Sequence, residues 1–103
     1  MKGYQLTTEA QRDLDAIAEY IAIEANVERA IAVLHEFRTE FRKLAEMPGM
    51  GHFREDLLDR RFKFWTVYSY VVVYRWESTP IQVIAIVHGA RDLDAFFARR
   101  PPG

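Results

Sequence analysis

Apolar residues recur at two different periods along the chain, and the change of period divides it into a helical half and a sheet half. Over residues 8–25 and again over 27–47 they recur every three or four positions, as on one face of an α-helix. The second helix should end at Met47, because Pro48 disfavours helix in the preceding residue. The apolar positions are Ala10, Leu14, Ile17, Ile21 and Ala25, then Ala30, Ile31, Leu34, Phe37, Phe41, Leu44 and Ala45.

Both predicted helices carry candidate caps. Thr8 and Gln11 have the spacing of a capping box, in which a hydroxyl and a side-chain amide each bond the other's backbone. Asn26 is placed to end the first helix and to cap the second. Because almost no loop separates the two helices, we predict that they pack as an antiparallel hairpin.

The sheet half begins at Phe62 and is rich in aromatic and β-branched residues, which favour strands. A turn at Glu77–Pro80 separates two such runs, and a polar, irregular connection at 52–61 precedes them. Alternation predicts two faces on the middle strand and two on the last. These are Tyr70, Val72, Tyr74 and Trp76 against Val71, Val73 and Arg75, then Ile81, Val83, Ala85 and Val87 against Gln82, Ile84, Ile86 and His88.

These elements predict an α+β fold in a single domain over residues 1–103. The helical hairpin would pack on one face of a small antiparallel sheet, which a short first strand at Tyr4–Leu6 could join. Asp92 would cap a short C-terminal helix that carries Leu93, Phe96 and Phe97. Since both sheet faces are apolar and one hairpin covers one face, we expect apolar surface beside the hairpin or on the sheet's open face.

Composition excludes several kinds of site. The chain has no cysteine, so it has neither a disulfide nor a thiol nucleophile. The three histidines, His35, His52 and His88, lack metal-ligand spacing, and we expect no metal and no cofactor. No apolar run approaches the roughly 20 residues of a membrane helix and no signal peptide is recognisable, which predicts a cytoplasmic protein without membrane contact.

The charges are nearly balanced overall, with a formal net charge of −1, but they are unevenly distributed. Residues 1–46 hold nine acidic and six basic residues, whereas residues 47–103 hold six acidic and eight basic ones. This falls short of the strongly basic profile of nucleic-acid binders, and it favours a protein partner without direct sequence-specific nucleic-acid binding.

The order and spacing of these segments resemble the ParE branch of the ParE/RelE toxin superfamily, over nearly the whole chain. The motifs that carry the resemblance are Tyr4-x-Leu6, Asp13-Leu14-x-x-Ile17-x-x-Tyr20-Ile21, Met47-Pro48-Gly49-Met50-Gly51, Tyr70-Val71-Val72-Val73-Tyr74-Arg75 and His88-Gly89-Ala90-Arg91-Asp92. The resemblance implies the toxin of a type II toxin–antitoxin (plasmid stabilisation) module. It further implies that the toxin poisons DNA gyrase and is neutralised by a ParD-like antitoxin.

RelE-like members of the superfamily instead cleave mRNA on the ribosome, and their pattern implies two arginines and a tyrosine at positions that are Val71, Arg91 and Phe97 here. Attack of a ribose 2′-hydroxyl on the adjacent phosphate needs a base and cations, and neither valine nor phenylalanine supplies them. We therefore predict no catalytic residues, and hold the mRNA endonuclease as a first alternative. A non-toxic module that still binds an antitoxin is the second.

Four residues are candidate contacts for the target or the antitoxin: Arg61, Arg75, His88 and Arg91. Each arginine also has a purely structural interpretation. Arg91 could form an ion pair with Asp92 or Asp94, and the other arginines could belong to a solvated, charge-balanced surface beside Asp59. An antitoxin tail would lay an amphipathic helix on the hairpin, and the basic sheet half would favour acidic residues in it. A homodimer and a toxin–antitoxin hetero-oligomer are both compatible with the sequence.

Overall fold

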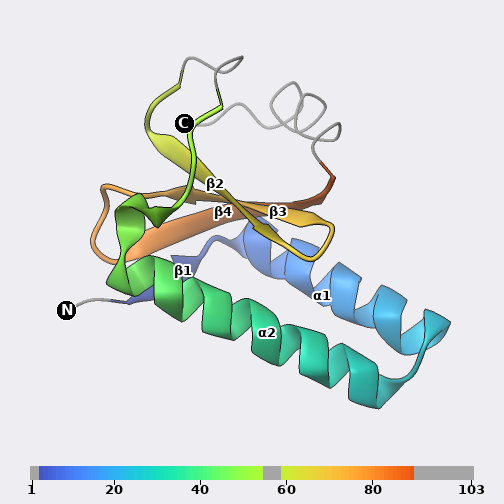
Figure 1. The fold of residues 1–103 in the computed structure, drawn as a ribbon. Helices are drawn as coiled ribbons and strands as arrows, with labels where there is room; N and C mark the ends of the chain where they lie inside the picture. Colours follow the sequence, from blue (N-terminus) through green and yellow to red (C-terminus); the bar gives the residue numbers. More distant parts are fainter. Residues whose placement is uncertain (1–2, 55–58, 90–103) are drawn as a thin grey trace.

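Four strands form one sheet, and two long helices cover one of its faces (Figure 1). The computed structural model describes residues 3–54 and 59–89 of the chain. The elements follow the order β1 (Tyr4–Leu6), α1 (Thr8–Glu24), α2 (Val27–Glu46), β2 (Phe62–Val67), β3 (Tyr70–Arg75) and β4 (Ile81–His88), with a 3₁₀ turn at Pro48–Met50. The predicted C-terminal helix at Asp92–Phe97 lies outside the described residues.

The strands lie in the order β1-β4-β3-β2. The predicted meander is confirmed, because β2 pairs antiparallel with β3 and β3 with β4. β1 pairs with β4 in parallel, with Tyr4 opposite Ile81. The sheet is therefore mixed: the meander is antiparallel as predicted, and the first strand joins it in the parallel direction, which the sequence had left open. A parallel neighbour requires a long crossover, and the chain between β1 and β4 provides it through the hairpin and the meander.

The hairpin begins at a cap one residue earlier than predicted. Thr7, not Thr8, is the N-cap of α1, and its side-chain oxygen accepts a hydrogen bond from the Ala10 N–H at 3.1 Å. The Thr7 N–H donates to the Val83 carbonyl at 3.0 Å, so the position of the cap is set where β1 leaves the sheet. Asn26 caps α2 as predicted, and its Oδ1 accepts from the Arg29 N–H at 2.7 Å.

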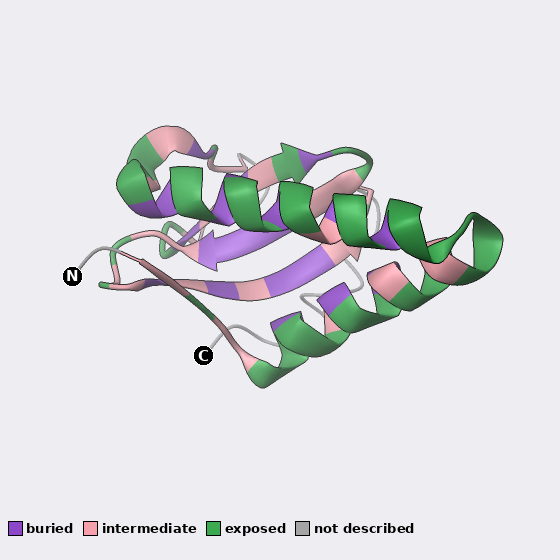
Figure 2. Ribbon diagram, turned by 90° about the horizontal axis from the view of Figure 1, so that it is seen from below, coloured by how far each residue is buried: buried purple, intermediate pink, exposed green. Residues whose placement is uncertain are grey.

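The hairpin face of the sheet is the centre of the core. In Figure 2 the buried positions of α1 and α2 lie on the sides turned to the sheet, and exposed positions lie on the outer sides. Aromatic rings connect the layers: Phe41 packs on Tyr4 at 5.2 Å between centroids, and Phe37 packs on Tyr70 at 5.8 Å. As predicted, Tyr70, Val72, Tyr74 and Trp76 all belong to this cluster.

A β-bulge in β4 changes which residues reach each face. Val73 lies opposite Ala85 but Tyr74 lies opposite Val83, so Ile84 is an extra residue on β4. Such an insertion interrupts the two-residue alternation. Ile81, Val83 and Ile86 belong to the hairpin-side core, whereas Ala85 and its neighbours Ile84 and Val87 pack in the opposite cluster. The prediction that Ala85 and Val87 share a face with Ile81 and Val83 was therefore wrong.

The second face of the sheet also has a buried centre. Phe62, Phe64, Val73 and Ala85 form this cluster, and each is at most 6% exposed. Apolar surface therefore remains mainly beside the hairpin, where Tyr20, Ile23, Val27 and Ile31 are at least half exposed. Among the described residues, the hairpin is therefore one of the two predicted places that keeps exposed apolar side chains.

Candidate functional site

Two adjoining hollows lie between the tip of the helical hairpin and the end of the sheet. They have volumes of about 290 Å³ and 330 Å³, and both are lined by Tyr20 of α1 and Tyr70 of β3. Because they share these walls, they form one surface depression, called here the hairpin-tip trough. Its other lining residues include Ile21, Ala25 and Val33 in the first hollow, and Ala16, Ile17 and His88 in the second.

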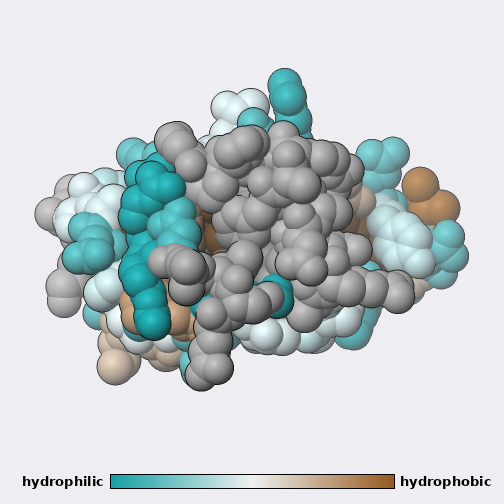
Figure 3. Space-filling model, turned by 90° about the horizontal axis from the view of Figure 1, so that it is seen from above, coloured by the Kyte–Doolittle hydropathy of each residue, from teal (hydrophilic) through white to brown (hydrophobic). Residues whose placement is uncertain are grey.

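The trough exists because the hairpin is longer than the sheet it covers. In Figure 1 the joined ends of α1 and α2 extend beyond the β2–β3 turn. The apolar stripe of α1 continues to Tyr20, which is 60% exposed although Ile17 is buried one turn earlier. In Figure 3 hydrophobic atoms stand out at the hairpin end of the molecule, and a strongly hydrophilic band crosses the other end.

Tyr70 forms the rigid part of the trough. Its ring packs edge-on against Phe37 at 5.8 Å and lies 5.1 Å from the His88 ring. Burial raises the pKa of the Tyr70 hydroxyl, and the nearby Tyr20 raises it further, so this wall carries no charge at neutral pH. Contacts on two sides hold the ring in place before any ligand arrives.

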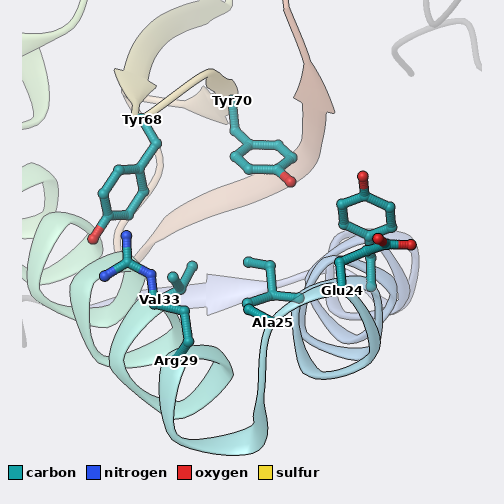
Figure 4. Close-up of a pocket in the computed structure, with 8 residues that line it drawn as sticks. Glu24, Ala25, Arg29, Val33, Tyr68 and Tyr70 are labelled. Carbon is teal, nitrogen blue, oxygen red and sulfur yellow. The ribbon is translucent and has the colours of Figure 1, made fainter.

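Tyr68 projects over the first hollow from the turn between β2 and β3. Figure 4 shows its ring hanging above Arg29 and Val33 of α2, while Tyr70 points into the space above Ala25. Its backbone φ is +56°, the left-handed region, and the ring is 54% exposed. Two-residue hairpin turns favour Gly, Asn or Asp at such positions, so a bulky aromatic residue there is unusual.

The walls of the trough differ in charge. Glu24 stands at the C-terminal end of α1, and Arg29 stands in the first turns of α2. Among the residues that line the two hollows, Glu24 on α1 and Arg29 on α2 carry charges of opposite sign. The trough thus offers a partner one anionic side chain on the α1 side and one cationic side chain on the α2 side.

The three predicted contact residues that the structure describes, Arg61, Arg75 and His88, do not form one site. His88 is exposed at the end of β4 and borders the trough. Arg61 and Arg75 lie at the opposite end of the sheet, where each guanidinium sits 5.3 Å from the centre of the Phe62 ring. Arg61 also donates to both carboxylate oxygens of Asp59, at 2.9 and 2.7 Å. Arg91 lies outside the described residues and stays a prediction.

Arg61 and Arg75 are better described as part of the fold than as an open cationic site. The hydrogen bond from Arg61 is the first cause that lowers the pKa of Asp59, and the charge of Arg75 contributes to the same shift. Glu77 and Ser78 complete a shallow hollow of about 210 Å³ around the two arginines. Asp59 forms an ion pair with Arg61, and Glu77 lines the same hollow, while a role of either arginine in contacting a partner stays a prediction.

Val71 occupies the place at which the nuclease branch of the superfamily is expected to carry an arginine. It pairs with Thr66 on β2 and with Val87 on β4, and it packs against the cluster of Phe62, Phe64, Val73 and Ala85. The side chains of this cluster are apolar, and the nearest cations that the structure describes there are the Arg61 and Arg75 guanidinium groups over Phe62. Phe97, the other substituted position, lies outside the described residues.

Sequence reasoning did not single out Tyr20, Tyr68 or Ile23 as site residues. A signal for Ile23 was present, because it departs from the apolar stripe of α1 and is 73% exposed. Tyr68 lies within a continuous segment of aromatic and β-branched residues that predicts a strand. Only the folded backbone shows that it occupies a turn. Among the described residues no group of three or more acidic, histidine or cysteine side chains could hold a metal ion, and no helix there is long and apolar enough to cross a membrane.

Comparisons with known proteins agree with one another. The family described as "ParE toxin of type II toxin-antitoxin system, parDE" matches residues 4–93. Toxin ParE1 of Caulobacter vibrioides is 33% identical over 88 residues, which cover 85% of this chain and 90% of that protein. The solved structure "Chromosomal ParDE TA system from P. aeruginosa" superposes with a TM-score of 0.72 at 20% identity, covering 86% of this chain and 97% of that one. At this identity the solved structure supports the fold.

Proposed function

The chain belongs to the ParE toxin family of type II toxin–antitoxin systems, and from this premise we propose that it poisons DNA gyrase and that a ParD-like antitoxin neutralises it. In this proposal the toxin acts by binding gyrase in the cytoplasm, with no metal and no cofactor. Its gene and that of the antitoxin would form a plasmid-stabilisation type of module.

The environment of Val71 is the main observation in favour of a toxin that acts by binding its target and against one that cleaves RNA. Cleavage of RNA through its 2′-hydroxyl requires a group that accepts a proton and cations that stabilise the phosphorane. Val71 can do neither, and its neighbours on that face are Phe62, Phe64, Val73 and Ala85.

The hairpin-tip trough supports a protein partner. Large exposed apolar side chains gathered at one place on a small domain are typical of an interaction surface. Tyr20, Ile23, Val27 and Tyr68 are each more than half exposed near the hairpin tip. An antitoxin that covers them would bury surface that is unfavourable in water, and we expect the whole complex to bury more than about 1,600 Å².

The proposal is tested by adding the purified chain to DNA gyrase in supercoiling and DNA-cleavage assays, with and without the product of an adjacent ribbon-helix-helix reading frame. We expect loss of supercoiling and accumulation of cleaved DNA, both prevented by the antitoxin. A parallel reaction contains ribosomes and mRNA at stoichiometric toxin. Light scattering of the same samples reports whether the free chain is a homodimer and whether the complex is a hetero-oligomer.

Three results distinguish the candidate functions. Inhibited gyrase with intact mRNA supports the proposal. Codon-specific cuts in ribosome-bound mRNA would replace it with the endonuclease. Binding of the antitoxin with neither effect would show a module that has kept its partner and lost its toxicity.

A further inference from the structure

Resting on the proposed function, we propose that Arg60 and Lys63 contact the phosphate backbone of the DNA that gyrase holds, at the end of the sheet where β2 begins and β3 ends (Figure 1). Both cations lie on the aromatic rings of Phe53 and Trp76, and these four residues are called here the cation–aromatic face. The contact would be independent of base sequence, and it would make the affinity of the toxin for gyrase depend on bound DNA.

The cation–aromatic face is a compact group of contacts. Arg60 Cζ lies 4.5 Å from the centroid of the Phe53 ring, and Lys63 Nζ lies 4.5 Å from the same centroid and 4.8 Å from that of Trp76. The two rings pack edge-on at 5.8 Å, so they form a common support. Contacts of this kind occur about once per 70–80 residues in proteins, and here three share two rings.

The positive charge of these two side chains is not neutralised within the part of the chain that the structure describes. The two ion pairs described there lie within α2 and at Asp59, and they involve neither Arg60 nor Lys63. An aromatic face attracts a cation through its quadrupole and leaves the net charge in place. It also restricts a long side chain before any ligand arrives, which lowers the entropic cost of binding.

Both cations have hydrogen-bond donors left for a ligand. Lys63 Nζ donates to the Gly49 carbonyl at 3.0 Å and to the Gly51 carbonyl at 3.4 Å, and an ammonium has a third N–H. The exposed Arg60 guanidinium makes no side-chain hydrogen bond within the described residues. Because each charged group lies 4.5 Å from the Phe53 centroid, the two are at most twice that distance, 9 Å, apart. Phosphates recur about every 3.4 Å of rise along one DNA strand, so the pair can contact two nearby phosphates.

The backbone around the two cations favours a ligand that carries acceptors only. The Gly49 and Gly51 carbonyls already accept from Lys63, and the Arg60 carbonyl accepts from Trp76 Nε1 at 2.9 Å. A peptide segment would bring N–H donors that find few acceptors at this place. A phosphodiester brings acceptors alone, and DNA is the densest array of anions among the macromolecules that the proposed function brings together.

The contact depends on gyrase to position it. Two cations on a chain with a formal net charge of −1 do not make a protein that holds DNA by itself. Once the toxin is bound to gyrase beside its DNA, the same contact becomes intramolecular, and its effective concentration is high. The weak basic character of the whole chain is therefore compatible with a local phosphate contact.

The test measures the affinity of the labelled full-length chain by fluorescence anisotropy, for gyrase alone and for gyrase loaded with a linear DNA duplex of arbitrary sequence, over a series of salt concentrations. At low salt the wild type should bind gyrase with DNA about tenfold more tightly than gyrase alone. A contact with two phosphates releases counterions, so the slope of log affinity against log salt should be steeper by about 2 when DNA is present.

Arg60 is the sharper residue to vary, because Lys63 also holds the turn at Gly49 and Gly51. Arg60→Gln should lose about threefold or more of the affinity that DNA adds and lower the slope by about 1, with binding to gyrase alone unchanged. Arg60→Lys keeps the charge and should keep the slope. Arg38→Gln makes the same change of charge at an exposed position of α2 and should behave like the wild type. Thermal unfolding should show that all the variants fold as the wild type does, since these side chains are exposed.

The outcomes separate this inference from the function on which it rests. If the wild type neither inhibits nor binds gyrase, the proposed function fails and the DNA contact fails with it. If the wild type inhibits gyrase but DNA adds no affinity, or Arg60→Gln keeps all of the added affinity, the DNA contact alone is overturned. It is also overturned if Arg60→Gln weakens binding equally without DNA, which would place an acidic surface of gyrase here, or weakens only the binding of the antitoxin, which would place an acidic antitoxin segment here.

Discussion

The hydroxyl of Tyr74 donates a hydrogen bond to the carbonyl oxygen of Pro48 at 2.7 Å, across 26 positions of sequence. The same oxygen accepts a hydrogen bond from the Gly51 N–H at 3.0 Å. Tyr74 is fully buried, and burial raises the pKa of its hydroxyl. One side chain of the middle strand thus satisfies the backbone of the turn that follows α2.

Tyr74→Phe should lower the free energy of unfolding by about 1–3 kcal/mol, because it leaves two backbone groups of the turn without this partner in a buried place. Urea unfolding followed by circular dichroism measures the change. A variant as stable as the wild type would mean that water or a rearranged turn replaces both bonds.

Gly51→Ala should destabilise the fold, whereas Gly49→Ala should not. A Cβ on Gly51 would lie 2.5 Å from the Tyr74 hydroxyl oxygen and 3.0 Å from the Phe64 carbonyl, while a Cβ on Gly49 would meet nothing within 4 Å. Overpacking of this kind costs about 1–3 kcal/mol. The two substitutions are the same chemically and lie in the same turn, so equal melting temperatures would contradict the packing argument.

Glu40 connects α2 to β2 through a partly buried carboxylate. It accepts a hydrogen bond from Trp65 Nε1 at 2.9 Å and from Lys43 Nζ at 2.7 Å. Burial acts to raise the pKa of Glu40, but these hydrogen bonds and the charge of Lys43 outweigh it, and the pKa lies below the usual value. The carboxylate is therefore the form that the folded state favours.

Glu40→Gln should remove a pH-dependent part of the stability. A group with a lowered folded-state pKa stabilises the protein above its unfolded-state pKa, about 4.3 for Glu, and loses that contribution as pH falls through the folded-state value. The wild type should exceed the variant in unfolding free energy by a constant amount from pH 7 to about 5, and the gap should shrink below about pH 4. A gap independent of pH would show that the carboxylate is not what stabilises the contact.

Asn26→Ala should destabilise the chain by about 1 kcal/mol, the typical effect of losing a helix N-cap. The side chain accepts from the Arg29 N–H at 2.7 Å at the start of α2, and Asn26→Ser keeps an acceptor there. Chemical denaturation should rank the wild type and the Ser variant above the Ala variant. If the three unfold together, the hairpin loop is held by packing alone.

Arg91→Ala should weaken toxicity or antitoxin binding while lowering stability by no more than about 1 kcal/mol, the scale of a surface ion pair. Growth inhibition and calorimetry measure the two functions, and thermal unfolding measures the stability. Loss of neither function would leave Arg91 with the ion pair to Asp92 or Asp94 as its role.

The sequence by itself determined both helices and the three strands of the meander. These elements depend on local preferences: a 3.6-residue apolar period over 8–25 and 27–47, and β-branched and aromatic residues from Phe62 onward. Asn26 and Pro48 act on their immediate neighbours, so the start of α2 and its end near Met47 were predictable to within a residue.

Only the tertiary structure decided the features that depend on distant partners. The cap moved to Thr7 because its N–H reaches Val83, and the bulge at Ile84 turned Ala85 away from the hairpin. The trough arises because the hairpin is longer than the sheet beneath it, which no local pattern records. Periodicity assigns an apolar residue to a face, but whether that face is covered depends on where the other layer ends. Ile17 is therefore buried, whereas Tyr20, one turn further along the same helix, lies on the surface.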